Sequence, residues 1–399
     1  MEQPSLAEFA EGAREFVAGH YRPVTAGAAE VQMSDRVTVI PERTQAEEEA
    51  DLVEARRWHA AADDAGFGWP DGPVQYGGRG LGPEYAAVYR EVESSFAVPD
   101  EGYTRFSIGI CTPTLLEHGS TELKDRYLRA LRRADLVACQ LFSEPDAGSD
   151  LASARTRAVR DGDGWLLSGQ KVWTSGAHYS EIGMVLARTG DVDQKHAGLS
   201  VFMIDMRQPG IDVRPIKQMT GGASFNEVFL DGARVADWAR LGEVGAGWRV
   251  ITTTLRHERA VIGSDGAVDL LLVPRLVELA RRCGREDDAA VRGAIAEIHV
   301  RAVAHSKMTQ RYLRLAGAGG APGPEMSLSK LLLTDNLQRV SELVQDLLGE
   351  SFTADTGQWG TFGWNQLALT LPGLRIGGGT DEVLRTIVAQ RVLGLPRAG

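Results

Sequence analysis

The stretch that decides the fold is Cys139-Gln140-Leu141-Phe142-Ser143-Glu144-Pro145-Asp146-Ala147-Gly148-Ser149-Asp150, and it is followed by Gly169-Gln170-Lys171-Val172-Trp173-Thr174-Ser175. The Glu-Pro step forces an extended or turning backbone. The Ala-Gly-Ser-Asp that follows leaves this backbone bare enough for a ligand to approach closely. A surface loop that joins a helix to a strand is the alternative for the first segment alone. The two segments in this order and spacing are more specific and favour a ligand site.

The overall composition restricts the class of protein. The chain has 399 residues, enough for two or three domains with substantial cores. It is 43% hydrophobic and 24% charged, as ordinary soluble globular proteins are. The net charge of -11 argues against a nucleic-acid partner, because nothing would offset the repulsion by phosphates. An anionic ligand is still allowed, since it needs only a locally positive pocket.

Cysteine usage and the N-terminus predict a cytoplasmic protein. The three cysteines, Cys111, Cys139 and Cys283, form no CxxC pair, so neither a metal site nor a disulfide framework is expected. The first residues contain no apolar stretch typical of a secretory signal. No run approaches 18 apolar residues, so no membrane span is expected.

The secondary-structure pattern of the sequence changes twice, which predicts an α+β multidomain protein. Residues 1–135 are expected to form an all-helical domain, because apolar residues recur there at helical spacing. Residues 136–240 contain short β-type runs separated by turn residues, which predicts a small barrel or sandwich of antiparallel strands. Residues 241–399 return to long helical patterns. Neither a GxGxxG after a strand nor a P-loop is found, so a dinucleotide would have to be held in another way.

The two quoted segments resemble the flavin and thioester contact segments of the acyl-CoA dehydrogenase family, and the resemblance covers nearly the whole chain. It implies an N-terminal helical domain, a middle β-barrel domain and a C-terminal four-helix bundle. It also implies an FAD-dependent enzyme that converts an acyl-CoA thioester to the trans-2-enoyl-CoA. In this family a glutamate base removes the α proton and flavin N5 takes the β hydride.

The resemblance also implies which residues hold the flavin. Trp173 and Ser175 are two apart, so on a strand they point to the same face; a core aromatic is the alternative for Trp173. Thr380 should cap the last helix. One of the two glycines usual in the diphosphate segment is missing. The residues expected to bind FAD are Gln140, Phe142, Ser143, Trp173, Ser175, Gln345, Gly349, Thr380 and Glu382.

The expected base is Glu258. Many relatives carry the base in a Tyr-Glu-Gly-Thr loop, but Gly378 occupies that glutamate position here. A minority, including isovaleryl-CoA dehydrogenase, place it in a Leu-x-x-Glu-Arg segment on a helix, which matches residues 255–259. The N–H of Gly378 could still polarise the thioester carbonyl. A solvated helical glutamate paired with a neighbouring arginine is the alternative for Glu258, and Asp381 and Glu382 are the alternative bases.

The remaining expectations concern substrate and partners. By resemblance, the substrate contacts are Gly148, Ser149, Arg259 and Gly379. Gln390 replaces an arginine that relatives often have near the adenine of the coenzyme, which leaves room for an acyl-carrier-protein substrate. The electron acceptor implied is an electron-transfer flavoprotein, and the assembly implied is a homo- or hetero-tetramer. Two other functions stay open: a catalytically silent subunit of a heteromeric dehydrogenase, and a flavin monooxygenase on the same fold.

Overall fold

The computed structural model describes residues 3–24, 43–264, 268–317, 323–354 and 361–396. It divides into two units, each described here by itself. The first contains the described residues up to Glu258, and the second those from Arg259 onward. No helix in these ranges is both long and apolar enough to cross a membrane.

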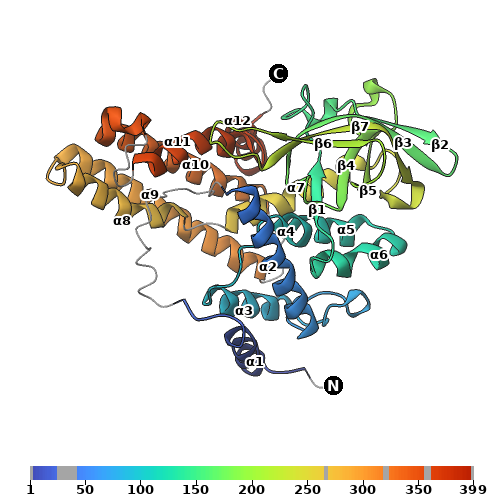
Figure 1. Cartoon of the computed structure of the whole chain (residues 1–399), viewed down its shortest axis with the longest axis horizontal. Helices are drawn as coiled ribbons and strands as arrows, with labels where there is room; N and C mark the ends of the chain where they lie inside the picture. Colours follow the sequence, from blue (N-terminus) through green and yellow to red (C-terminus); the bar gives the residue numbers. More distant parts are fainter. Residues whose placement is uncertain (1–2, 25–42, 265–267, 318–322, 355–360, 397–399) are drawn as a thin grey trace. The chain divides into compact units, whose positions relative to one another are not determined.

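The first unit begins with helices (Figure 1). Ser5 and Thr44 each start a helix with a capping box, in which a glutamate three residues later reaches back to the cap backbone. Aromatic side chains such as Phe9, Trp58 and Tyr85 form the core between these helices. The helices are α1 (Leu6–Ala18), α2 (Gln45–Asp64), α3 (Pro83–Ser94), α4 (Thr104–Phe106), α5 (Thr112–His118) and α6 (Thr121–Arg132).

An eight-stranded sheet follows, with seven strands in the order β6-β7-β3-β2-β4-β5-β8 and with β1 paired to β4. The prediction of antiparallel strands was wrong at two places, because β1 and β2 both pair with β4 in parallel. The described strands also leave the sheet open between β6 and β8, so the expected barrel is not closed. The strands are β1 (Ala138–Leu141), β2 (Arg157–Asp161), β3 (Gly164–Ser175), β4 (Ile182–Arg188), β5 (Leu199–Asp205), β6 (Ile211–Ile216), β7 (Phe225–Ala236) and β8 (Arg240–Leu241).

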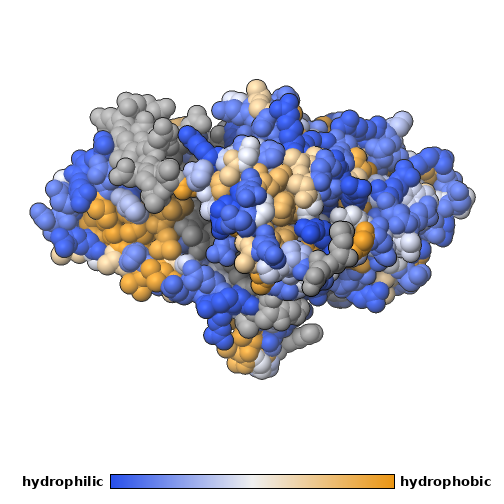
Figure 2. Space-filling model, turned by 90° about the horizontal axis from the view of Figure 1, so that it is seen from below, coloured by the Kyte–Doolittle hydropathy of each residue, from blue (hydrophilic) through white to orange (hydrophobic). Residues whose placement is uncertain are grey.

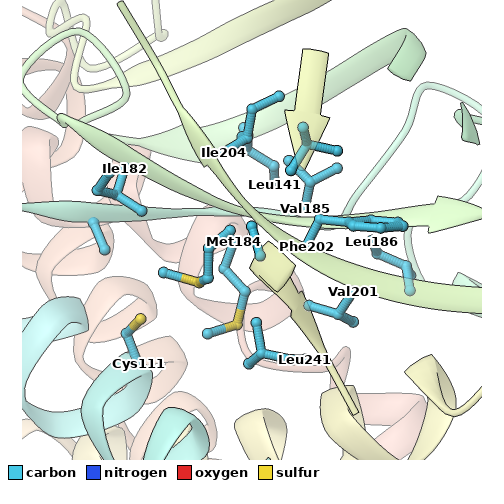
Figure 3. Packing of buried hydrophobic residues seen from close by; sticks show 14 of the residues in the cluster. Cys111, Leu141, Ile182, Met184, Val185, Leu186, Val201, Phe202, Ile204 and Leu241 are labelled. Atoms are coloured by element: carbon cyan, nitrogen blue, oxygen red, sulfur yellow. The ribbon is translucent and has the colours of Figure 1, made fainter. Parts of the chain in front are cut away.

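The core of the first unit lies around β4, every residue of which is buried (Figure 3). Met184, Val185 and Leu186 pair with β5 residues that include Val201 and Phe202. A strand covered on both faces loses the usual alternation of apolar and polar residues. Each large apolar side chain buried there stabilises the fold by about 1.5–3 kcal/mol. Leu141 of β1 pairs with Val185, so the quoted segment 139–150 begins beside this core.

Helix α7 (Gly247–Ser264) begins in the first unit, where Val250 and Ile251 are buried, and it continues past Glu258 into the second. The second unit is helical. On α10, Leu337, Val340 and Val344 are buried at helical spacing, which confirms the pattern seen in the sequence. Its helices are α8 (Val268–Arg282), α9 (Ala289–Gly317), α10 (Ser327–Leu348), α11 (Thr361–Ile376) and α12 (Asp381–Ile387).

Candidate active site

The two quoted segments lie against each other in the first unit. The Lys171 Nζ donates to the carbonyl oxygen of Phe142 at 3.1 Å and to Glu144 Oε1 at 2.7 Å. The backbone N–H of Val172 donates to the carbonyl oxygen of Ser143 at 3.0 Å. The structure therefore brings together residues that are almost thirty positions apart in the chain.

The Lys171–Glu144 ion pair is buried, with 0% and 7% of the two side chains exposed. The Glu144 carboxylate also accepts the backbone N–H groups of Arg155 at 2.7 Å and Thr156 at 2.9 Å. Burial lowers the pKa of Lys171 to about 8 in spite of the attraction of Glu144. Burial opposes ionisation of Glu144 as well, but the Lys171 charge and the hydrogen bonds outweigh it and lower the pKa of Glu144. Both groups are therefore charged at neutral pH.

Trp173 lies on a β-bulge. Lys171 pairs with Val228 and Thr174 pairs with Asn226, so β3 carries one residue more than β7 at this point. Trp173 has a φ of 60°, a conformation that costs an L-residue roughly 1–2 kcal/mol. The bulge reverses the alternation of the strand, so that Lys171 points inward while Trp173 is 55% exposed.

These residues fit a flavin. Trp173 and Ser175 are both exposed while Thr174 between them is buried, so both point to the same face, as expected. Phe142 is 2% exposed, so it can offer a flavin only its backbone, while Ser143 is half-buried. A large apolar ring that is held exposed by a strained backbone matches an aromatic wall beside an isoalloxazine.

Gln140 and Glu258 are in contact. The Gln140 Nε2 on β1 donates to Glu258 Oε2 on α7 at 3.3 Å. Glu258 is half-buried. One neighbouring arginine, Arg256, donates to Glu117 at 2.7 Å. The expected base and one of the expected flavin residues therefore belong to one cluster in the first unit.

Helix α7 is fixed against α5 by polar contacts next to Glu258. Thr253 lies 2.8 Å from His118 Nε2, and the hydroxyls of Thr114 and Thr254 lie 3.3 Å apart. Burial first, and then the charge of Arg256, lower the pKa of His257. The His257 imidazole is therefore neutral at pH 7, as suits a neighbour of a base.

The glycine loop that replaces the usual glutamate loop lies in the second unit. Gly378 and Gly379 have φ values of 65° and 93°, which favour glycine. The Thr380 hydroxyl accepts the N–H of Val383 at 3.2 Å, so the predicted helix cap is confirmed.

Lys330, which sequence reasoning missed, holds this loop. Its buried Nζ donates to the carbonyl oxygens of Arg375 at 3.0 Å and Gly379 at 2.5 Å. The Nζ also lies 3.4 Å from Oδ1 of Asp381, which is 2% exposed and accepts hydrogen bonds from Thr334 and Arg375. These contacts commit Asp381 to the loop rather than to proton abstraction. A lysine inside the apolar run at the start of α10 was the signal for Lys330.

The other predicted site residues are divided between the two units. Arg259, Lys330 and Gly378 line a cavity of about 10 Å³ with Met326. Gln345 donates to Ser341 at 3.1 Å, and Gly349 ends α10 with a φ of 53°. Gly148 has open space around it, Ser149 is exposed and Glu382 is exposed. No group of three or more possible metal-ligating side chains is found among the described residues.

Comparison with known proteins identifies the family. Three sequence profiles of the acyl-CoA dehydrogenase family match: the N-terminal domain over residues 3–135, the middle domain over 139–233 and the C-terminal domain over 245–393. Acyl-CoA dehydrogenase IpdE1 of Mycobacterium tuberculosis is 39% identical over 353 residues, which is 86% of this chain and 89% of that protein. The chain belongs to the acyl-CoA dehydrogenase family.

Three further relatives are informative. Acyl-CoA dehydrogenase FadE34 of M. tuberculosis is 36% identical over 92% of this chain, but the match spans only 50% of that relative. The solved Tcur3481–Tcur3483 steroid ACAD has a TM-score of 0.75 at 26% identity, with 100% of this chain and 99% of that chain covered. The ChsE4–ChsE5 complex of M. tuberculosis gives a TM-score of 0.74 at 26% identity, over 100% of this chain and 99% of that chain.

Family membership confirms the predicted fold class, the prediction of an oxidoreductase and FAD as the cofactor. The roles given to individual residues, the domain boundaries and the cytoplasmic location stay predictions.

Proposed function

We propose that this protein catalyses the FAD-dependent α,β-dehydrogenation of an acyl-CoA thioester, with Glu258 as the base. The single observation that carries the proposal is the 3.3 Å contact between Gln140 and Glu258. It connects the helix segment that the sequence identified as an alternative place for the base to the strand that leads into the flavin segment. The bound FAD supplies the hydride acceptor.

The residues of the chain divide the remaining work. Glu258 removes the α proton, and the Gln140 amide orients its carboxylate. The N–H of Gly378 polarises the thioester carbonyl. The flavin ring is contacted by Gln140, Phe142, Ser143, Trp173 and Ser175. The adenosine and diphosphate end of FAD is contacted by Gln345, Gly349, Thr380 and Glu382. The acyl thioester is contacted by Gly148, Ser149, Arg259 and Gly379.

The proposed substrate is an acyl-CoA, and the proposed electron acceptor is an electron-transfer flavoprotein. Acyl-CoA thioesters that carry a ring system belong in any substrate panel, because a solved relative at 26% identity is named a steroid ACAD. A thioester on an acyl-carrier protein is the alternative, because Gln390 stands where relatives often have an arginine.

The test is anaerobic mixing of the FAD-loaded protein with a panel of acyl-CoA thioesters while flavin absorbance is followed. Bleaching, with loss of two hydrogens from the thioester by mass spectrometry, supports the proposal. Glu258→Gln should retain FAD and lose bleaching, whereas Glu243→Gln, whose side chain is 93% exposed, should bleach as the wild type does. Equal bleaching by Glu258→Gln would assign the base to another residue.

A second candidate is a half-site subunit that works only with a different chain. It is favoured by the glycine at position 378, by the two-protein names of the solved relatives, and by the match to only half of FadE34. The second unit also exposes apolar side chains, including Leu271 on α8 and Val300 on α9 (Figure 2 shows hydrophobic surface over these helices). We propose that this surface contributes to a tetramer, either of one chain or of two.

The size of the purified protein and its flavin content distinguish these assemblies. A homotetramer that retains FAD and bleaches supports the first proposal. A chain that retains FAD only after co-expression with a second acyl-CoA dehydrogenase chain supports the half-site candidate.

A further inference from the structure

We propose that the buried Lys171–Glu144 ion pair is a positioning device that holds the β3 bulge and the Phe142–Ser143 backbone in the geometry that FAD requires. The proposal rests on FAD binding and does not depend on which residue is the base. Both residues lie in the quoted segments, but the sequence alone assigned neither of them a role.

The ion pair joins three segments of the first unit. One lysine Nζ contacts the Phe142 carbonyl oxygen and Glu144 Oε1, at 3.1 and 2.7 Å. The same carboxylate accepts two backbone N–H groups from Arg155 and Thr156, just before β2. The pair thus connects the loop after β1, the entry to β2 and the middle of β3.

The ion pair lies next to the bulge that carries Trp173. The bulge lies directly after Lys171, and the N–H of Val172 leaves the β7 ladder and donates to Ser143 at 3.0 Å. Without the bulge, Trp173 would point to the same side as Lys171, into the core. The positive φ of Trp173 persists only where the surroundings impose it, and the Lys171 contacts are the adjacent anchor.

Burying the two charges has an energetic cost. A buried ion pair contributes little net stability compared with apolar residues of the same size, so its presence alone does not explain stability. A buried pair is better suited to fix a unique geometry, because an ammonium with carbonyl and carboxylate partners allows few arrangements. The groups fixed here are those expected to touch the flavin.

The test measures the bound flavin and needs no substrate. We expect Lys171→Met and Glu144→Gln each to weaken FAD binding by about tenfold, which is about 1.4 kcal/mol. Each variant should also change the visible circular dichroism of the bound flavin and shift its midpoint potential. The double variant should resemble the single ones, because the two side chains act as a unit. In the wild type, the flavin dichroism should change as the pH rises through about 8, where Lys171 loses its proton, and Lys171→Met should show no such change.

Leu186→Ala is the matched control, because Leu186 is a fully buried β4 residue that pairs with Val201 on β5, and it takes no part in the hydrogen bonds described for Lys171 and Glu144. It should lower the free energy of unfolding and leave the dichroism and the potential of the flavin as in the wild type. Two results together would overturn the proposal even if Lys171→Met did not fold. The first is a flavin dichroism and midpoint potential in Glu144→Gln equal to those of the wild type. The second is a flavin spectrum of the wild type that does not change with pH. This test does not depend on whether the flavin in Glu258→Gln is still bleached by substrate.

Discussion

The amide of Gln140 and the carboxylate of Glu258 meet at 3.3 Å although 118 residues separate them in the chain. One lies on the strand that leads into the flavin segment, and the other on the helix that runs into the second unit. A hydrogen bond from a neutral donor stabilises the charged form of a carboxylate and fixes its direction. The proposed orientation of the Glu258 carboxylate therefore depends on this contact.

Replacing Gln140 therefore should change how the rate depends on pH. In Gln140→Leu the donor to Glu258 is lost, so protonation of the carboxylate becomes easier. The acid limb of the kcat/KM profile should move to higher pH, and kcat should fall because the base is less well oriented. Gln140→Asn, which keeps an amide, should give an intermediate profile. An unchanged acid limb in Gln140→Leu would show that the contact does not influence the base.

Lys330 should be needed for the stability of the second unit. Lys330→Met removes an ammonium from between two carbonyl oxygens and the buried Asp381. We expect the free energy of unfolding to fall by about 2–3 kcal/mol, because Arg375 and Thr334 still contact the carboxylate. Urea unfolding measures the change. Lys307→Met on the exposed surface of α9 is the control and should stay within about 0.5 kcal/mol of the wild type. A loss that small for Lys330→Met would contradict its role in holding the loop.

Trp173 should matter for the flavin and not for stability. Its side chain is 55% exposed, so Trp173→Phe should change the free energy of unfolding by less than about 1 kcal/mol. The same variant should alter the absorbance and dichroism of the bound FAD, since the indole is the expected wall of the flavin. Trp364→Phe, at a residue that is 1% exposed, should show the reverse. A large loss of stability with an unchanged flavin spectrum in Trp173→Phe would return Trp173 to the role of a structural aromatic.

The lowered pKa of His59 predicts that the free energy of unfolding falls as the pH falls. Burial and the charge of Arg132 lower the pKa of His59 to about 4, compared with about 6.5 in an unfolded chain. As the pH falls, the unfolded state takes up the proton first. The contribution of His59 is therefore present above about pH 6.5 and is lost as the pH falls toward 4, by up to about 3 kcal/mol.

Urea unfolding between about pH 7 and 4 tests this sign. The decline should be shallower in His59→Gln than in the wild type, and unchanged in His20→Gln, because His20 is exposed at the end of α1. Parallel curves for the wild type and His59→Gln would contradict the half-buried, neutral imidazole.

The sequence predicted strands and a helix cap, because these depend on residues close together in the chain. The short β-type runs expected between residues 136 and 240 include the strands β4 and β5, and Thr380 caps α12. Local patterns do not determine which strands pair, so the parallel pairing of β1 with β4 and the open sheet were not foreseen. The bulge at Trp173 was not predicted for the same reason, since it depends on the register of β3 against β7.

The sequence proposed residues for the candidate site but not their geometry. Motif resemblance pointed to Glu258 and Trp173. It could not show that Gln140 reaches Glu258, because that contact depends on how α7 packs against the sheet. The roles of Lys171 and Lys330 were missed because a lysine is usually exposed, and only tertiary contacts show that both are buried.

The most direct test of the central claim is exchange of the α proton, since it isolates the step assigned to Glu258. A thioester that bleaches the flavin would be incubated with the protein in D2O without an electron acceptor, and α-deuteration would be followed by NMR. We predict that Glu258→Gln lowers the exchange rate by roughly 10²–10⁴-fold while FAD stays bound. Exchange by Glu258→Gln at the wild-type rate would contradict the assignment of Glu258 as the base.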